Sequence, residues 1–127
     1  MKIYAKVVGL SDDVEEEVVL DLGGVQVYGF LVCSPRELRL GEICMVLLEP
    51  SFIDAMDLRV EPSARTSFRR RGETFAYEVS GFISGNQLIT EFVALRDDDF
   101  HELYGYLEGS CVTTTVDRIN VTIISPK

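Results

Sequence analysis

Apolar and polar residues alternate along several stretches of the chain, and a period of two indicates a β-strand with one buried face. Ile3, Ala5 and Val7 alternate with more polar neighbours, which predicts a first strand near the start of the chain. The segment from Ile43 to Leu48 is apolar at every position, which is typical of a strand buried on both faces. We expect that strand to end at Pro50.

Gly23-Gly24 marks the clearest hairpin, because a two-residue turn needs positive φ angles that glycine adopts without steric cost. Counting outward from the turn produces a register with one apolar face and one mixed face. The predicted pairs are Leu22 with Val25, Asp21 with Gln26, Leu20 with Val27, Val19 with Tyr28, Val18 with Gly29 and Glu17 with Phe30.

Gly85-Asn86 marks a second hairpin by the same reasoning. Apolar and polar residues alternate along both arms, which predicts strand pairing over the whole of segment 77–94. The predicted pairs are Ile83 with Leu88, Phe82 with Ile89, Gly81 with Thr90, Ser80 with Glu91, Val79 with Phe92, Glu78 with Val93 and Tyr77 with Ala94.

A short helix is predicted at residues 99–108. Asp99 as a cap, Glu102 three residues later and Gly109 just past the end match a capped helix. Residues 103–107 also alternate as a strand does, so a strand is the alternative for this segment.

The remaining segments are predicted to be loops and turns that connect the strands. Residues 11–17 are rich in acids and predict an exposed loop, and residues 34–42 predict a connector with a proline and a glycine. Residues 51–57 predict a short helical turn opening near Ser51. Residues 58–73 have little apolar periodicity and contain four arginines, which predicts a long, mobile loop.

The last part of the chain is rich in β-branched residues at 112–116 and 119–124, which predicts two strands or one strand bulged at Asp117-Arg118. Together these elements predict a mainly β fold with residues 1–127 in a single domain. The expected architecture is a small antiparallel barrel, OB-like or Greek-key, of about six strands with one or two short helices. The order of elements, a leading meander followed by a loop, a hairpin and a helix-plus-strand tail, resembles the OB-type barrel.

Composition narrows the class of protein further. A chain of 127 residues that is 46% hydrophobic is large enough to form one core without disulfides. The first residues lack the pattern of a signal peptide, so we expect a cytoplasmic protein. A net charge of −9 repels polyanions, which disfavours nucleic acid and anionic membranes as partners.

Few side chains suggest chemistry. Cys33, Cys44 and Cys111 are each set among apolar residues and are expected to be buried free thiols, although Cys33 and Cys44 could be neighbours on adjacent strands. His101 is the only histidine. We therefore expect no catalytic residue, no metal site and no cofactor. An enzyme remains an alternative if acids, or a Cys-His pair, converge only in the fold.

The segment from Arg65 to Arg71 contains the candidate binding residues. Arg65, Phe68, Arg69, Arg70 and Arg71 combine guanidinium groups, which bind phosphate or carboxylate, with a ring that can stack on a base. The competing interpretation is that these arginines pair with the protein's own acids or with those of a partner subunit.

The function expected from the sequence is a non-catalytic β-barrel domain that acts by protein association, either with itself or with another protein. The alternative is an OB-like binder of single-stranded nucleic acid, or of another anionic ligand, through the Arg65–Arg71 loop.

Overall fold

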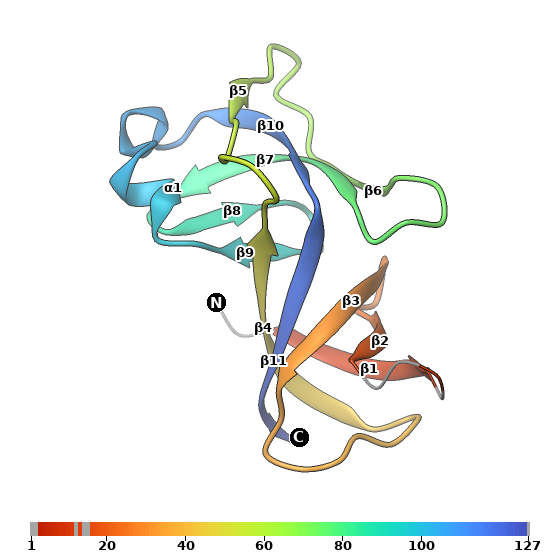
Figure 1. Ribbon diagram of the computed structural model, residues 1–127. Helices are drawn as coiled ribbons and strands as arrows, with labels where there is room; N and C mark the ends of the chain where they lie inside the picture. The colour runs from red at the N-terminus through yellow and green to blue at the C-terminus, as the bar shows by residue number, and fades with distance from the viewer. Residues whose placement is uncertain (1–2, 12, 14–15, 127) are drawn as a thin grey trace.

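The computed structural model describes residues 3–11, 13 and 16–126, which form two β-sheets stacked one above the other in Figure 1. The first sheet contains β1 (Ile3–Leu10), β2 (Glu17–Asp21), β3 (Gln26–Cys33), β4 (Ile43–Ser51) and β11 (Arg118–Pro126). The second contains β5 (Arg59–Val60), β6 (Ser67–Arg70), β7 (Tyr77–Ser84), β8 (Gln87–Ile89), β9 (Ala94–Arg96) and β10 (Cys111–Val116). The prediction of a mainly β fold is confirmed, but the described residues form eleven strands rather than about six.

The pairings of the first sheet return to their start. The order is β1-β2-β3-β11-β4, and β4 also pairs with β1. All of these pairs are antiparallel except β3 with β11, which is parallel, so the expectation of antiparallel pairing throughout is wrong. The reason is topological: β11 enters this sheet from the second sheet and not through a hairpin from β3 (Figure 1).

The register of the first hairpin is confirmed from Glu17 with Phe30 to Asp21 with Gln26. The turn forms as the glycines require, with Gly23 at a φ of 99°. The Asp21 carboxylate accepts the Gly23 N–H at 2.8 Å, which holds the turn from within the strand that precedes it.

The predicted register of the second hairpin is confirmed only for the pairs next to its turn. Ile83 pairs with Leu88 and Phe82 with Ile89, but the other predicted pairs do not form. The chain reverses again after Ile89, because the hydroxyl of Thr90 both donates to the Val93 carbonyl and accepts the Val93 N–H, each at 3.1 Å. The returning strand β9 then pairs with β8, while β6 pairs with β7 from Tyr77 to Ser80 and β10 pairs with β7 from Tyr77 to Phe82.

The helical predictions were too long or misplaced. Segment 99–108 contains one short helix, α1 (Asp99–Glu102), and a 3-10 turn, η1 (Gly105–Leu107). The residue at the cap is Asp98, which makes no side-chain capping bond, whereas Asp97 accepts the N–H of Asp99. No helix opens near Ser51, because Pro50 and Ser51 extend β4 and pair with the start of β11.

The prediction of one long loop at 58–73 is wrong where strands form. β5 pairs with β10, and β6 pairs along its whole length with β7, so the arginine segment lies largely on an ordered hairpin. The acidic segment 11–17 lies partly outside the described residues, at positions 12, 14 and 15.

One buried cluster contains residues from both sheets, including Leu20 and Leu48 from the first and Val79 and Val112 from the second. Tyr77 crosses between them: it is 1% exposed, and its hydroxyl accepts the backbone N–H of Tyr28 at 2.8 Å. Among the residues that the structure describes, no helix is long and apolar enough to cross a membrane.

Candidate functional site

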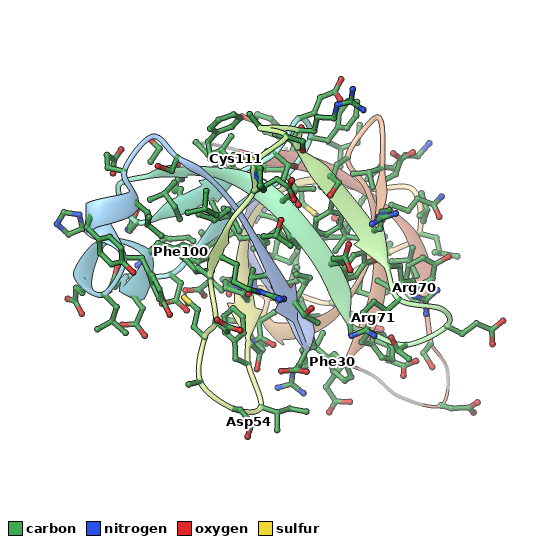
Figure 2. All side chains as sticks on the ribbon, turned by 90° about the horizontal axis from the view of Figure 1, so that it is seen from above. Phe30, Asp54, Arg70, Arg71, Phe100 and Cys111 are labelled. Atoms are coloured by element: carbon green, nitrogen blue, oxygen red, sulfur yellow. The ribbon has the colours of Figure 1, made fainter. Side chains whose placement is uncertain are left out.

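Strand β6 contains Arg69 and Arg70, and Arg71 follows it directly; Figure 2 shows Arg70 and Arg71 on the same side of the molecule as Phe30. Arg69 and Arg70 are successive residues of a strand and therefore point to opposite faces. Arg69 pairs with Glu78 at 2.7 Å, and both side chains are largely exposed. An exposed pair of this kind contributes about 0–1 kcal/mol, so Arg69 is paired but not strongly held.

The Arg70 side chain is half-buried and makes several contacts with other residues of the chain. Its guanidinium lies 3.6 Å from the centroid of the Tyr28 ring. It also donates to the carbonyls of Thr74 at 2.6 Å and Glu73 at 3.0 Å, both in the turn after β6. The side chain therefore fastens the β6–β7 hairpin to the outer face of β3, and these contacts fix the position of its guanidinium.

The other three candidates are divided between packing and solvent. Phe68 stacks on Tyr77, with ring centroids 4.3 Å apart and planes 24° from parallel. Arg65 and Arg71 are exposed, and neither guanidinium has a partner in the described part of the chain. The five predicted residues thus do not converge on one site, and Arg65 and Arg71 are the two that remain open to a ligand.

A groove of about 400 Å³ lies between the β6–β7 hairpin and the strands β1, β2 and β3. Tyr28, Phe75 and Arg70 line it together with two acids, Glu17 and Glu73. The Phe75 ring also contacts Phe30, with centroids 4.7 Å apart. Because two carboxylates line the groove beside one guanidinium, it is a poor place for a polyanion.

A wider groove of about 600 Å³ lies between the segment after β4 and helix α1, and it gathers Asp54, Asp97 and Asp99. The hydroxyl of Tyr104 donates to the Met56 carbonyl at 2.8 Å and ties the two segments together. Within the described ranges, no group of three or more His, Cys, Asp or Glu side chains is arranged to hold a metal ion.

The thiols differ from the expectation at one position. Cys44 and Cys111 are buried as predicted, and burial raises the pKa of both thiols, but Cys33 is exposed near the end of β3. Cys33 and Cys44 are not neighbours, because β11 lies between β3 and β4. His101 is exposed on α1, whereas the Cys111 thiol faces the Arg65 carbonyl at 3.8 Å.

The strand expected to be buried on both faces is buried on only one. Cys44, Val46 and Leu48 point into the core, while Ile43 is 43% exposed and Met45 and Leu47 are half-buried. Tyr4 pairs across from Met45 and is 51% exposed, and Ile124 on β11 is 50% exposed. We call Tyr4, Ile43, Met45, Leu47 and Ile124 the outer apolar face.

Sequence reasoning missed this face because an unbroken apolar strand indicates burial without saying what buries it. The signal was present in the partner strand, where polar Lys6 and half-polar Tyr4 alternate with the buried residues. Residues directly opposite each other on paired strands lie on the same face of the sheet, so the residues of β4 opposite Tyr4 and Lys6 must also face solvent.

These features define a small two-sheet, mainly β protein whose exposed surface includes an apolar strand face and the guanidinium groups of Arg65 and Arg71. The chain belongs to the family described as uncharacterised conserved protein UCP019853, whose model matches residues 1–124. No curated protein and no solved structure matches the chain.

Proposed function

We propose that this protein is a non-catalytic β module that acts by protein association, and that a second copy of the chain docks on its outer apolar face. The observation that carries the proposal is the row of Ile43, Met45 and Leu47 along β4, flanked by Tyr4 and Ile124. Single exposed apolar residues are ordinary, but a contiguous group on three adjacent strands is typical of an interaction surface.

The charges at the ends of the row favour a second copy as the partner. Lys6 lies beside Ile43 at one end, and Glu49 follows Leu47 on the same face at the other. A two-fold axis near Met45 places Lys6 of one subunit against Glu49 of the other, as a self-complementary interface requires. Because the whole chain carries a charge of −9, two copies repel through most other faces.

Light scattering coupled to gel filtration tests the proposal at about 100 µM protein, a concentration that detects even a weak dimer. The wild-type protein is expected to be a dimer, and Met45→Lys a monomer that keeps the circular dichroism spectrum of the folded state. Ile53→Lys is the matched control, since Ile53 is 84% exposed outside this face and the charge change is the same. A monomeric wild type, or a dimer that survives Met45→Lys, contradicts self-association through this face.

A second candidate function is an OB-like binder of single-stranded nucleic acid or another anionic ligand. Its support is the five-stranded ring, which opens in a meander as an OB-type barrel does, together with two exposed arginines. Arg65 and Arg71 would make the phosphate contacts, because their guanidinium groups are exposed.

Fluorescence anisotropy with a labelled single-stranded oligonucleotide separates this candidate from the first. Binding that weakens steeply between 50 and 200 mM salt, on the order of tenfold or more, and that falls in Arg65→Gln and Arg71→Gln, supports it. An absence of binding at the lowest salt eliminates it without affecting the dimer proposal.

A further inference from the structure

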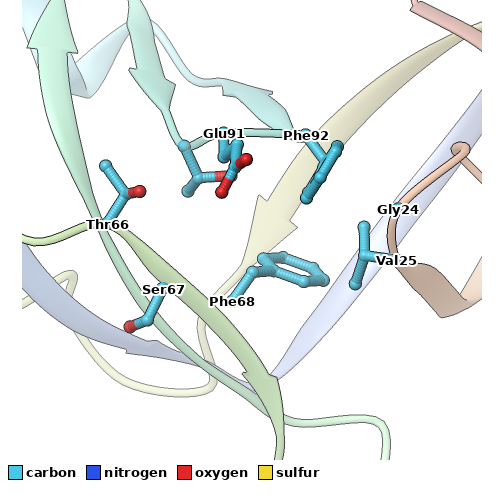
Figure 3. A pocket seen from close by; sticks show the side chains of 8 residues that line it. Gly24, Val25, Thr66, Ser67, Phe68, Glu91 and Phe92 are labelled. Atoms are coloured by element: carbon cyan, nitrogen blue, oxygen red, sulfur yellow. The ribbon is translucent and has the colours of Figure 1, made fainter.

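A third cavity, of about 210 Å³, lies at the junction of the two sheets. We infer that it binds a small organic cation with an alkylammonium or guanidinium head group, a site that does not depend on the proposed association. Figure 3 shows the side chains around it, with Phe68 and Phe92 on one side and Glu91 and Thr66 on the other. The full lining is Gly24, Val25, Thr66, Ser67, Phe68, Thr90, Glu91 and Phe92.

Two aromatic rings form the apolar wall of the cavity. Phe92 is 46% exposed even though it packs against the Gly24 turn so closely that a Cβ there would lie 2.3 Å from the ring. Phe68 is held in place by its stacking on Tyr77. Because the faces of such rings carry negative potential, they attract cations, and nearly half of the Phe92 residue surface is exposed to solvent.

The polar side of the cavity is negative. Glu91 is exposed, and its carboxylate has no partner within the part of the chain that is described. Among the residues that the structure describes, no lysine or arginine lines the cavity. The hydroxyls of Thr66 and Ser67 form no hydrogen bond with another described residue and can accept N–H groups, whereas the Thr90 hydroxyl is bonded to Val93.

The ligand class follows from this combination. One carboxylate, two aromatic rings and the Thr66 and Ser67 hydroxyls suit a cation with an apolar or planar head group, and the carboxylate opposes phosphates and carboxylates. The volume accommodates a group of side-chain size and not a folded partner. The overall charge of −9 raises the local concentration of cations around the protein.

The test is an NMR titration of the backbone amides with tetramethylammonium chloride and with methylguanidinium chloride. Sodium chloride at equal ionic strength and tert-butanol, a neutral molecule of similar shape, are the reference titrations. Saturable shifts confined to residues 66–68 and 90–92 are expected for the two organic cations. Glu91→Gln is expected to weaken binding by about threefold or more, as is Phe92→Leu. Glu37→Gln, which removes the same charge at an exposed position outside the cavity, is expected to leave the affinity unchanged.

A further titration distinguishes the source of the cation. A short peptide with one internal arginine that binds more tightly than methylguanidinium assigns the site to a protein side chain, and weaker binding assigns it to a free metabolite. Shifts that do not saturate overturn the inference, as do equal shifts with tert-butanol. Equal affinity in Glu91→Gln, with a native spectrum elsewhere, also overturns it.

Discussion

Replacing Tyr77 with phenylalanine removes one hydroxyl from the junction between the two sheets and leaves the ring in place. The hydroxyl accepts the Tyr28 N–H at 2.8 Å, on the edge of β3 where pairing with β11 has not yet begun. Without it, that N–H has no partner in a partly buried position. Losing the hydrogen bond and stranding the donor is expected to cost about 2 kcal/mol of unfolding free energy.

Urea denaturation followed by circular dichroism measures this loss. With a slope of about 1–3 kcal/mol per molar urea, the midpoint of Tyr77→Phe is expected to fall by roughly 1 M. Tyr106→Phe is the matched control, because Tyr106 is 78% exposed, and its unfolding free energy should change by less than about 0.5 kcal/mol. A loss at Tyr77 no larger than that of the control would refute the idea that this hydroxyl joins the sheets.

The same residue predicts a dependence on alkaline pH. Burial raises the pKa of Tyr77 above its ordinary value, in spite of the opposing hydrogen bond from Tyr28. The folded state therefore holds the phenolic proton more tightly than the unfolded state does. Its contribution to stability is complete below about pH 10 and is lost as pH rises through the raised pKa. In Tyr77→Phe, this part of the alkaline destabilisation should be absent.

Three further predictions concern other positions. In the native protein Cys33 should react with a thiol reagent within minutes, whereas the two buried thiols should react only after unfolding, as counted by mass spectrometry. Gly81→Ala should lower the unfolding free energy by about 1–3 kcal/mol in urea titrations, because the added methyl would lie 2.6 Å from the Ile89 carbonyl oxygen. Hydrogen bonds from Ser63 lower the pKa of Glu61, so its carboxylate stabilises the folded state above the ordinary glutamate pKa, and this stabilisation is lost as the pH falls. Glu61→Gln should therefore lower the melting temperature at pH 7 and have less effect at pH 3, which thermal melts at both pH values measure.

Each of these results has a clear opposite. Rapid labelling of all three thiols would show that the core opens readily. An unchanged midpoint for Gly81→Ala would mean that β7 and β8 separate without cost, since the obstructing atom belongs to the backbone. A difference between Glu61→Gln and wild type that is the same at pH 3 as at pH 7 would show that the carboxylate charge is irrelevant.

Local rules predicted the parts of the fold that are formed by neighbouring residues. The Gly23-Gly24 hairpin was correct from Glu17 with Phe30 to Asp21 with Gln26, and the Leu22 N–H donates to the Val25 carbonyl, because a two-residue turn and an alternating pattern determine the register together. The second hairpin was correct only for its first pairs, because Thr90 creates a further reversal through its own side chain. The prediction paired the first half of β7 with residues 91–94, but β6 pairs there instead, and β6 lies outside the hairpin.

The arginine segment shows the same limit at the level of a site. The sequence shows four positive charges, but it does not show that Arg70 stacks on Tyr28 or that Arg69 meets Glu78 across a strand pair. Both contacts follow from pairing residues 67–70 with β7, and the segment was expected to be a loop. With a strand there, alternation alone would have sent these two arginines to opposite faces.

Strands β10 and β11 are separated only by Asp117, yet the first belongs to the second sheet and the other completes the first (Figure 1). During synthesis, β1 to β4 emerge early, but the gap between β3 and β4 stays open until residues 118–126 have been made. All strands of the second sheet, β5 to β10, are therefore synthesised before the last strand of the first sheet. The exposed edges of β3 and β4 must be shielded from other chains throughout that interval, and formation of the β3–β11 pair is expected to be among the slowest steps of folding.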